Sequence, residues 1–163
     1  MGNVTDDIDR ILAQWATERP DLDTEAMGVF GRVFRLSRVA GDAVEKAYAR
    51  YGIGRPEFDV LATLRRSGEP YQLSPGALAA SMMLSTGGTT ARLDRLEKSG
   101  LVTRSPDPDD RRAVLVRLTP SGHHLADEAV TAGLAEQQRL LSHLPPADRT
   151  HLTTLLRALL NGL

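Results

Sequence analysis

A run of small polar residues, Ser85 to Thr90, precedes a helical pattern that continues to Lys98. Serine and threonine hydroxyls, together with the free N–H groups at the start of a helix, can bond to phosphate oxygens or to base edges. Arg95 lies further along the same helix and is long enough to reach either kind of group. The first chemistry that the sequence indicates is therefore recognition of a nucleic acid, with a plain solvated amphipathic helix as the alternative.

A second charged segment, DDRR at 109–112, lies between two stretches rich in apolar and β-branched residues, 101–105 and 113–118. The connecting loop contains two prolines and three aspartates, which predicts a hairpin with a polar tip. An arginine at such a tip can enter a minor groove, where negative potential concentrates. Asp110 would then orient Arg112 through a charge-assisted hydrogen bond. A merely soluble turn is the alternative for this segment.

These groups need helices to position them, and the sequence carries clear start and stop signals. Ser74 followed by proline predicts a short helix at 75–81. Ser85 can cap a helix that continues to Lys98, and Gly100 is placed as its C-terminal stop. The expected order is therefore helix, helix and hairpin, which is more specific for DNA recognition than either part alone.

Three further helical patterns precede this region, at 5–18, 24–51 and 56–66. The first opens with Thr5 as a candidate cap and carries Trp15 on its apolar side. The third places polar residues four and seven positions apart, so that one side of the helix holds Asp59, Thr63 and Arg66.

Two leucine-rich helical patterns follow the hairpin, at 121–143 and 147–161, with two prolines between them. Their apolar surface is larger than one small domain readily covers, so we interpret them as a dimer interface together with the N-terminal helix. The predicted organisation is a single domain with three parts: dimerisation and ligand helices at 1–54, a DNA-binding lobe at 55–118 and dimerisation helices at 119–163.

The composition narrows the class of protein. A chain of 163 residues is long enough for one domain with a full core, and the absence of cysteine excludes disulfides, cysteine-ligated metals and thiol redox sensing. The net charge is −1, and residues 85–118 hold seven basic and five acidic side chains, so charge alone decides nothing about nucleic acid. No signal peptide or membrane-spanning run is present, and we expect a soluble cytoplasmic protein without a membrane partner.

Motifs of catalysis and of metal binding are missing. The sequence has no nucleophile motif, phosphate-binding loop or HExxH pattern. The four histidines are scattered and lack carboxylates at ligand spacing: His123, His124, His143 and His151. We therefore expect neither an enzyme nor a bound metal or cofactor.

The run SGLVTRSPDPDDRRAVLVRLTPSG resembles the wing signature of the MarR family of transcriptional regulators, and the helix order agrees over almost the whole chain. The resemblance implies a mainly α fold with a small β-wing, a winged helix-turn-helix, built as a homodimer through its N- and C-terminal helices. It also implies binding to a pseudo-palindromic operator in double-stranded DNA, and our first hypothesis is accordingly a repressor. Its expected DNA-binding residues are Ser74, Ser85, Thr86, Gly87, Thr89, Thr90, Arg95, Asp110, Arg111 and Arg112.

A narrower resemblance concerns a small ligand. The first helix with its tryptophan, followed by ERPDLD, is similar to the branch of MarR proteins that responds to urate and trans-aconitate. That resemblance implies a ligand site made of Trp15, Asp59, Arg66 and Arg92. A planar anion needs a guanidinium for its charge, an indole for stacking and a carboxylate to accept from ring N–H groups. The expected ligand is urate or another organic acid.

Other interpretations of the same residues stay open. Each of the four side chains has an ordinary structural role available, as an interfacial tryptophan, a solvated ion pair or a phosphate contact. The alternative for the whole chain is a winged-helix module for DNA binding or for protein–protein contact that takes no small ligand. Titration of anions against the protein–DNA complex would separate the two hypotheses.

Overall fold

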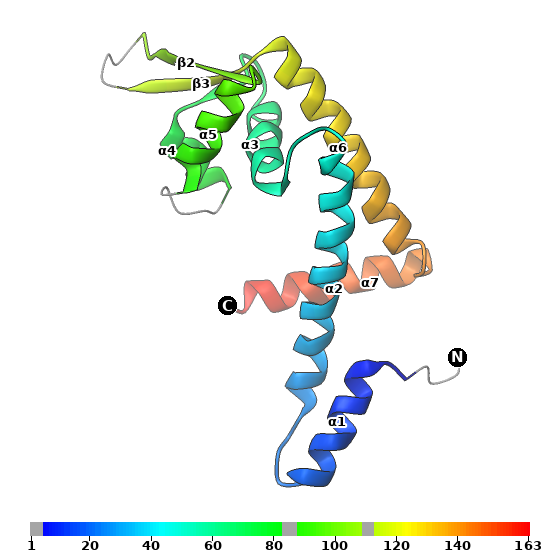
Figure 1. The fold of residues 1–163 in the computed structure, drawn as a ribbon. Coiled ribbons are helices and arrows are strands. Elements are labelled where there is room, and N and C mark those ends of the chain that lie inside the picture. The colour runs from blue at the N-terminus through cyan, green and yellow to red at the C-terminus, as the bar shows by residue number, and fades with distance from the viewer. Residues whose placement is uncertain (1–4, 83–87, 109–112) are drawn as a thin grey trace. The chain divides into compact units, whose positions relative to one another are not determined.

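The computed structural model describes residues 5–82, 88–108 and 113–163, and in this part of the chain it is mainly helical with one small sheet (Figure 1). The helices are α1 (Asp7–Glu18), α2 (Glu25–Ala49), α3 (Arg55–Arg66), α4 (Pro75–Ser81), α5 (Thr89–Lys98), α6 (Pro120–Leu141) and α7 (Pro146–Asn161), and the strands are β1 (Gln72–Leu73), β2 (Val102–Pro106) and β3 (Val114–Leu118). The chain forms two compact units, residues 1–43 and 44–163. The predicted fold class is confirmed.

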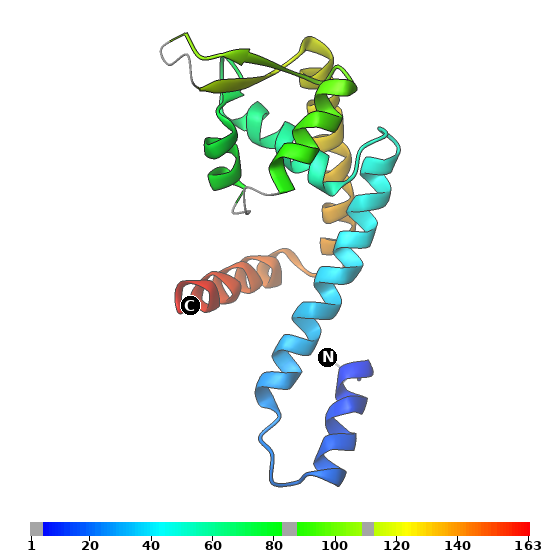
Figure 2. The ribbon, with the colours of Figure 1, turned by 60° about the vertical axis from the view of Figure 1, so that its left-hand side comes forward.

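In the first unit, α1 lies antiparallel along the N-terminal part of α2 (Figures 1 and 2). Asp6, not Thr5, caps α1, because its carboxylate accepts from the N–H groups of Ile8 and Asp9 at 2.8 and 3.0 Å. The carboxylate of Asp9 in turn accepts from the N–H of Asp6 at 2.8 Å. This reciprocal pair satisfies the free donors of the first turn and explains why the predicted cap is wrong by one residue.

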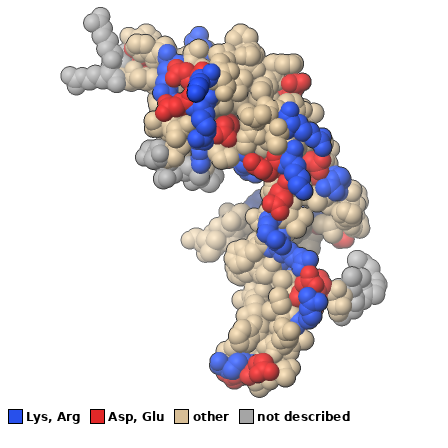
Figure 3. Space-filling model, in the orientation of Figure 1, with Lys and Arg blue, Asp and Glu red and all other residues tan. Residues whose placement is uncertain are grey.

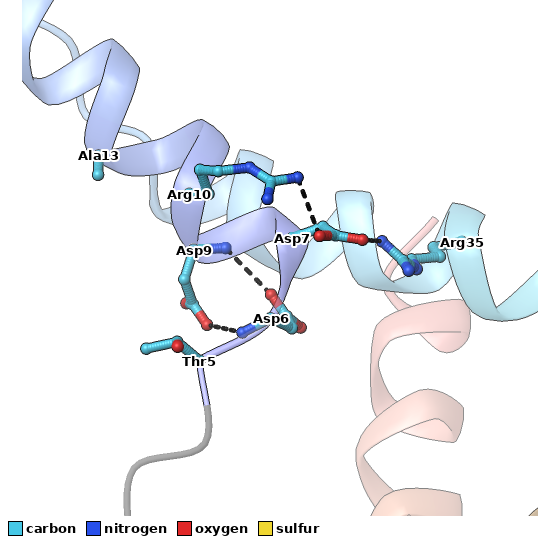
Figure 4. A pocket seen from close by; sticks show the side chains of 7 residues that line it. All are labelled: Thr5, Asp6, Asp7, Asp9, Arg10, Ala13 and Arg35. Atoms are coloured by element: carbon cyan, nitrogen blue, oxygen red, sulfur yellow. Dashed lines mark hydrogen bonds and ion pairs between the residues drawn. The ribbon is translucent and has the colours of Figure 1, made fainter.

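Arginines of α2 bind the acidic first turn of α1. Arg32 binds Asp6 at 2.9 Å and Asp9 at 2.6 Å. Arg35 binds Asp7 on the rim of a surface hollow of about 580 Å³, which Figure 4 shows from close by. Both arginines are therefore paired with carboxylates, and the acidic turn is tied to α2 by charge.

Close apolar packing supports the same contact between α1 and α2. A Cβ at Gly28 would lie 3.2 Å from Leu12, and a Cβ at Gly31 would lie 3.2 Å from Ile8. The two glycines therefore let the leucine and isoleucine of α1 approach the backbone of α2 closely. Most of the other large apolar side chains of this unit stay exposed, including Trp15 at 39% and Phe34 at 69%.

The core of the second unit forms around α3, whose Val60, Leu61 and Leu64 are fully buried. The C-terminal end of α2 contributes Val44 and Tyr48, and the ring of Tyr48 stacks on Phe58 with centroids 4.0 Å apart. Other elements complete this core with Leu78 of α4, Leu93 and Leu96 of α5, Val102 of β2, Val116 of β3 and Ala126 and Ala129 of α6.

The sheet has the strand order β1-β3-β2, and both pairings are antiparallel. β2 and β3 pair in the expected hairpin, with Val102 opposite Leu118 and Pro106 opposite Val114. The segment Gln72–Leu73 is too short to be predicted as a strand from the sequence. It forms β1, which pairs with the edge of β3 that faces away from β2. Gly100 ends α5 with a left-handed φ of +70°, as its position predicts.

The C-terminal helix α7 buries none of its residues. Four of its five leucines are exposed instead, and Leu160 is the most exposed of them at 69%. Within the described residues, no helix is both long enough and apolar enough to cross a membrane.

Candidate nucleic-acid interface

The candidate reading element consists of α4, α5 and the β2–β3 hairpin, which follow one another along the chain and share one core. α5 packs on α3 through Leu93 and Leu96, which are fully buried. Its opposite side is exposed and carries Thr90, Asp94 and Lys98. A helix supported on one side in this way can present its other side to a DNA groove.

Thr89 corrects one predicted DNA contact. The residue is only 3% exposed, because it stands four and seven positions before Leu93 and Leu96 and so shares their buried side. Among the described residues its hydroxyl oxygen has no hydrogen-bond partner. Thr89 therefore belongs to the packing of α5 and does not offer its side chain to DNA, whereas Thr90 is exposed as expected.

Ser74 begins α4 as predicted. Its hydroxyl oxygen accepts from the N–H of Ala77 at 3.2 Å, which satisfies one of the free donors of the first turn. The side chain is half-buried, and its hydroxyl hydrogen remains available to an acceptor. The predicted capping role of Ser74 is confirmed, and its contact with DNA stays a prediction.

Arg95 is exposed, but its guanidinium is not free. Its Nε and Nη2 atoms lie 2.8 and 2.6 Å from Oε1 of Glu57, at the start of α3. Burial raises the pKa of the Glu57 carboxyl. The hydrogen bonds from Arg95 and from the backbone N–H groups of Glu57 and Gly54 lower this pKa by a larger amount, so it falls below its usual value. The structure thus places the arginine that was expected to contact DNA in an ion pair with α3.

A second ion pair connects the other side of α5 to β2, and the sequence does not predict it. Arg104 of β2 binds Asp94 at 2.6 Å, and its backbone N–H donates to Glu97 at 3.2 Å. The residues are seven to ten positions apart and lie on different elements, so no helical or strand spacing indicates the contact.

The remaining predicted DNA contacts, Ser85, Thr86, Gly87, Asp110, Arg111 and Arg112, lie outside the described residues. In the view of Figure 3, positive and negative side chains stand next to each other over α5 and the neighbouring strands. The described part of this face therefore carries both signs of charge.

The predicted ligand residues come together in part. Asp59 and Arg66 line one surface pocket of about 240 Å³, together with Arg55, Thr63 and Ser81. Arg66 donates to the carbonyl oxygen of Ser81 at 2.9 Å and to Oγ1 of Thr63 at 3.3 Å. Asp59 binds Arg55 at 2.8 Å, one helical turn away. The pocket therefore contains one neutralised arginine and one arginine whose partners here are uncharged.

The other two predicted ligand residues are not among the described residues that line this pocket. Arg92 is half-buried and approaches Gly88, whose Cβ position would be 3.7 Å from its Nη2. Trp15 belongs to the first unit and lines a hollow of about 550 Å³ with Gln14, Thr17 and Glu18. A common site for all four residues stays a prediction.

Comparison with known proteins identifies the family. The model of the MarR family matches residues 53–114, which include α3 to α5 and β2. The transcriptional regulator PecS of Dickeya dadantii (strain 3937) is 39% identical over 150 residues, covering 92% of this chain and 90% of its own. The chain belongs to the MarR family. It is accordingly a DNA-binding transcriptional regulator and not an enzyme.

Two solved structures extend the comparison. A mutant MarR from E. coli complexed with operator DNA has a TM-score of 0.74 at 25% identity, covering 84% of this chain and 96% of its own. BpsR of Bordetella bronchiseptica, whose DNA binding is regulated by 6-hydroxynicotinic acid, has a TM-score of 0.71 at 28% identity, covering 85% of this chain and 95% of its own.

Proposed function

We propose that this member of the family is a homodimeric, cytoplasmic repressor that binds a pseudo-palindromic operator and is released by a small organic anion. The observation that carries the proposal is the similarity to PecS across almost the whole chain, because it includes the reading element and the flanking helices together. The operator complex of the related MarR supports DNA as the partner. Anion release is supported by the related BpsR and by the Arg66 pocket.

DNA recognition is assigned to the exposed side of α5 and to the tip of the β2–β3 hairpin. The N-terminal end of a helix attracts phosphate, and Thr90 exposes a hydroxyl near this end of α5. The proposed minor-groove contact of the hairpin is Arg112, which Asp110 is expected to orient. Ser74, Ser85, Thr86, Gly87 and Arg111 complete the proposed DNA-contacting residues.

Homodimerisation is proposed because large apolar side chains are exposed on the surface of one chain. Large apolar side chains that are at least 39% exposed are found on α1, on the N-terminal part of α2 and on α7, including Trp15, Met27, Phe30, Phe34, Leu155, Leu156, Leu159 and Leu160. Exposed patches of this kind mark interaction surfaces in proteins. A two-fold partner would cover the same apolar surfaces on both subunits, and it would set the spacing of the two reading elements on a palindromic operator.

The anion is proposed to bind at Arg66. The charge of this arginine is not neutralised by its partners Thr63 and Ser81, whereas Asp59 neutralises Arg55 in the same pocket. Because Ser81 ends α4, an anion that draws Arg66 away weakens a bond between α3 and the helix preceding α5. A coupling of about 1–3 kcal/mol between anion and operator would be sufficient for regulation. Trp15 and Arg92 are the further proposed ligand contacts.

The proposal is tested by fluorescence anisotropy with DNA from the intergenic region upstream of the protein's own gene. We expect a specific complex that weakens steeply with salt and is lost on Arg112→Ala. Urate, trans-aconitate and 6-hydroxynicotinate are then titrated against the complex. At least one of them should release the wild-type protein, and Arg66→Ala should abolish the response.

Arg65→Ala is the matched control, since Arg65 is adjacent on α3 but binds Asp127 and does not line the pocket. This variant should keep the anion response. Absence of a specific complex would exclude the DNA proposal. A specific complex that no anion releases would leave the alternative of a winged-helix module without a small ligand.

A further inference from the structure

We infer that Arg95 is a positioning residue that fixes α5 against the start of α3 through Glu57, and that it does not contact DNA. The inference deepens the proposed function, since it rests on α5 as the reading helix. The inference explains what fixes the angle between α5 and the DNA groove.

The carboxylate of Glu57 is held at both oxygens. Oε2 accepts from the backbone N–H of Gly54 at 3.2 Å, and Oε1 accepts from Arg95 at 2.8 Å. The side chain of Glu57 is only 15% exposed, whereas that of Arg95 is 60% exposed. Glu57 therefore has a fixed place, and the more exposed arginine takes its position from it.

The start of α3 is itself anchored. Glu45 of α2 accepts from the backbone N–H of Arg55 at 2.9 Å, next to the Gly54 N–H that Glu57 binds. Two carboxylates thus satisfy adjacent donors at this helix start, where negative charge is also favoured by the helix dipole. Arg95 consequently connects α5 to a rigid point of the second unit.

Arg104 holds the opposite flank of α5 through Asp94 and Glu97. The helix is therefore tied to α3 on one side by Arg95 and to β2 on the other side by two carboxylates. Rotation of α5 about its axis would stretch one set of these bonds. Removing the Glu57 pair releases one side only, and α5 then loses its defined angle while its buried leucines keep it in place.

A DNA contact by Arg95 would have to break this pair. The break would leave the carboxylate of Glu57 without its cation at a site that water reaches poorly, and such an unpaired charge is costly. Lys98 has no such constraint, since it is exposed on the same helix and has no ion pair among the described residues. The two basic residues should therefore behave differently when substituted.

The experiment measures operator affinity against KCl concentration for the wild type, Glu57→Gln, Arg95→Gln and the double variant. A positioning role predicts that each single variant weakens binding by roughly tenfold, that the double variant is no weaker than the singles and that the salt slope is unchanged. A phosphate contact predicts instead that Arg95→Gln lowers the slope by about 0.9 and that Glu57→Gln keeps or raises affinity. The second pattern would overturn the inference.

Lys98→Gln is the matched control for the loss of one positive charge from the same helix. Its effect on affinity should be additive with that of Glu57→Gln, because the two residues are not coupled. If the effects of Glu57→Gln and Lys98→Gln on operator affinity were coupled as strongly as those of Glu57→Gln and Arg95→Gln, a specific pair of Glu57 and Arg95 would be contradicted.

Amide hydrogen exchange of the free protein tests the inference without DNA. Glu57→Gln and Arg95→Gln should each speed exchange in α5, while exchange in α6 stays as in the wild type and shows that the unit remains folded. Unchanged exchange in α5 would overturn the inference. Failure of the wild type to bind any operator would instead contradict the proposed function, and the exchange result would still decide the role of Arg95.

Discussion

A Cβ added at Gly122 would lie only 1.9 Å from the carbonyl oxygen of Leu101, so α6 approaches the segment before β2 with no side chain between them. The same carbonyl accepts from the N–H of Thr119 at 3.1 Å, just before α6 begins. Because a backbone atom cannot yield as a side-chain tip can, Gly122→Ala should destabilise the protein by about 3 kcal/mol. Urea unfolding followed by circular dichroism measures this loss.

Gly41→Ala is the control for this substitution. Gly41 lies within α2, and no described atom comes within 4 Å of its Cβ position. Alanine there should raise stability by about 0.5–1 kcal/mol through helix propensity. Equal urea midpoints for Gly122→Ala and the wild type would contradict the close approach of α6 to Leu101.

The acidic first turn of α1 makes its contact with α2 sensitive to low pH. The N–H of Asp9 and the guanidinium of Arg32 lower the pKa of Asp6, and Arg35 and then Arg10 lower that of Asp7, both from an ordinary value of 3.8. A carboxyl with a lowered pKa stabilises the folded state above its unfolded pKa, and this contribution disappears as the pH falls through the folded value. The contact should therefore be intact above about pH 5 and weaken below 3.8.

Fluorescence of Trp15, the only tryptophan, reports this contact because it lies on α1. Emission should stay constant from pH 7 to about 5 and change below 3.8. Arg32→Gln removes the cation shared by Asp6 and Asp9 and should move the transition to higher pH. A transition of the wild type between pH 5 and 7 would require a different group.

Much of the fold follows from local signals in the sequence. Ser74 and the proline after it mark the start of α4, and Gly100 with its positive φ marks the C-terminal end of α5. The sequence predicts both because capping depends only on neighbouring residues. β1 could not be predicted, since two residues become a strand only through their pairing with β3. The apolar pattern of α2 predicts a helix, yet it cannot tell that Tyr48 is buried while Phe34 is exposed.

The site divides in a similar way. Asp59 and Arg66 share a pocket because seven positions bring two residues onto one side of a helix. The spacing of Thr89 with Leu93 also indicates burial, because residues four positions apart share one side of a helix. The pair of Glu57 and Arg95 spans 38 positions and depends on tertiary packing, so no spacing rule could identify it.

Tyr71 provides a test of the packing around β1. Its φ is +56°, its ring lies 5.2 Å below the guanidinium of Arg65, and it meets His123 edge-on at 4.8 Å. Loss of these contacts and of the partly buried ring in Tyr71→Ala should cost about 2 kcal/mol. Tyr71→Phe keeps the ring and should unfold at nearly the wild-type urea concentration. Equal losses for both variants would assign the effect to the hydroxyl instead.

Leu160 tests the proposed role of α7 in dimerisation. It is 69% exposed within one chain, so Leu160→Asp should leave the fold of the subunit intact while placing charge in an apolar interface. We expect the wild type to sediment as a dimer and Leu160→Asp to shift toward the monomer at micromolar concentration, with unchanged circular dichroism. Thr154→Asp is the control, since Thr154 is exposed on the side of the same helix that faces away from its leucines, and this variant should remain dimeric. A wild-type monomer, or a variant that stays dimeric, would remove α7 from the interface.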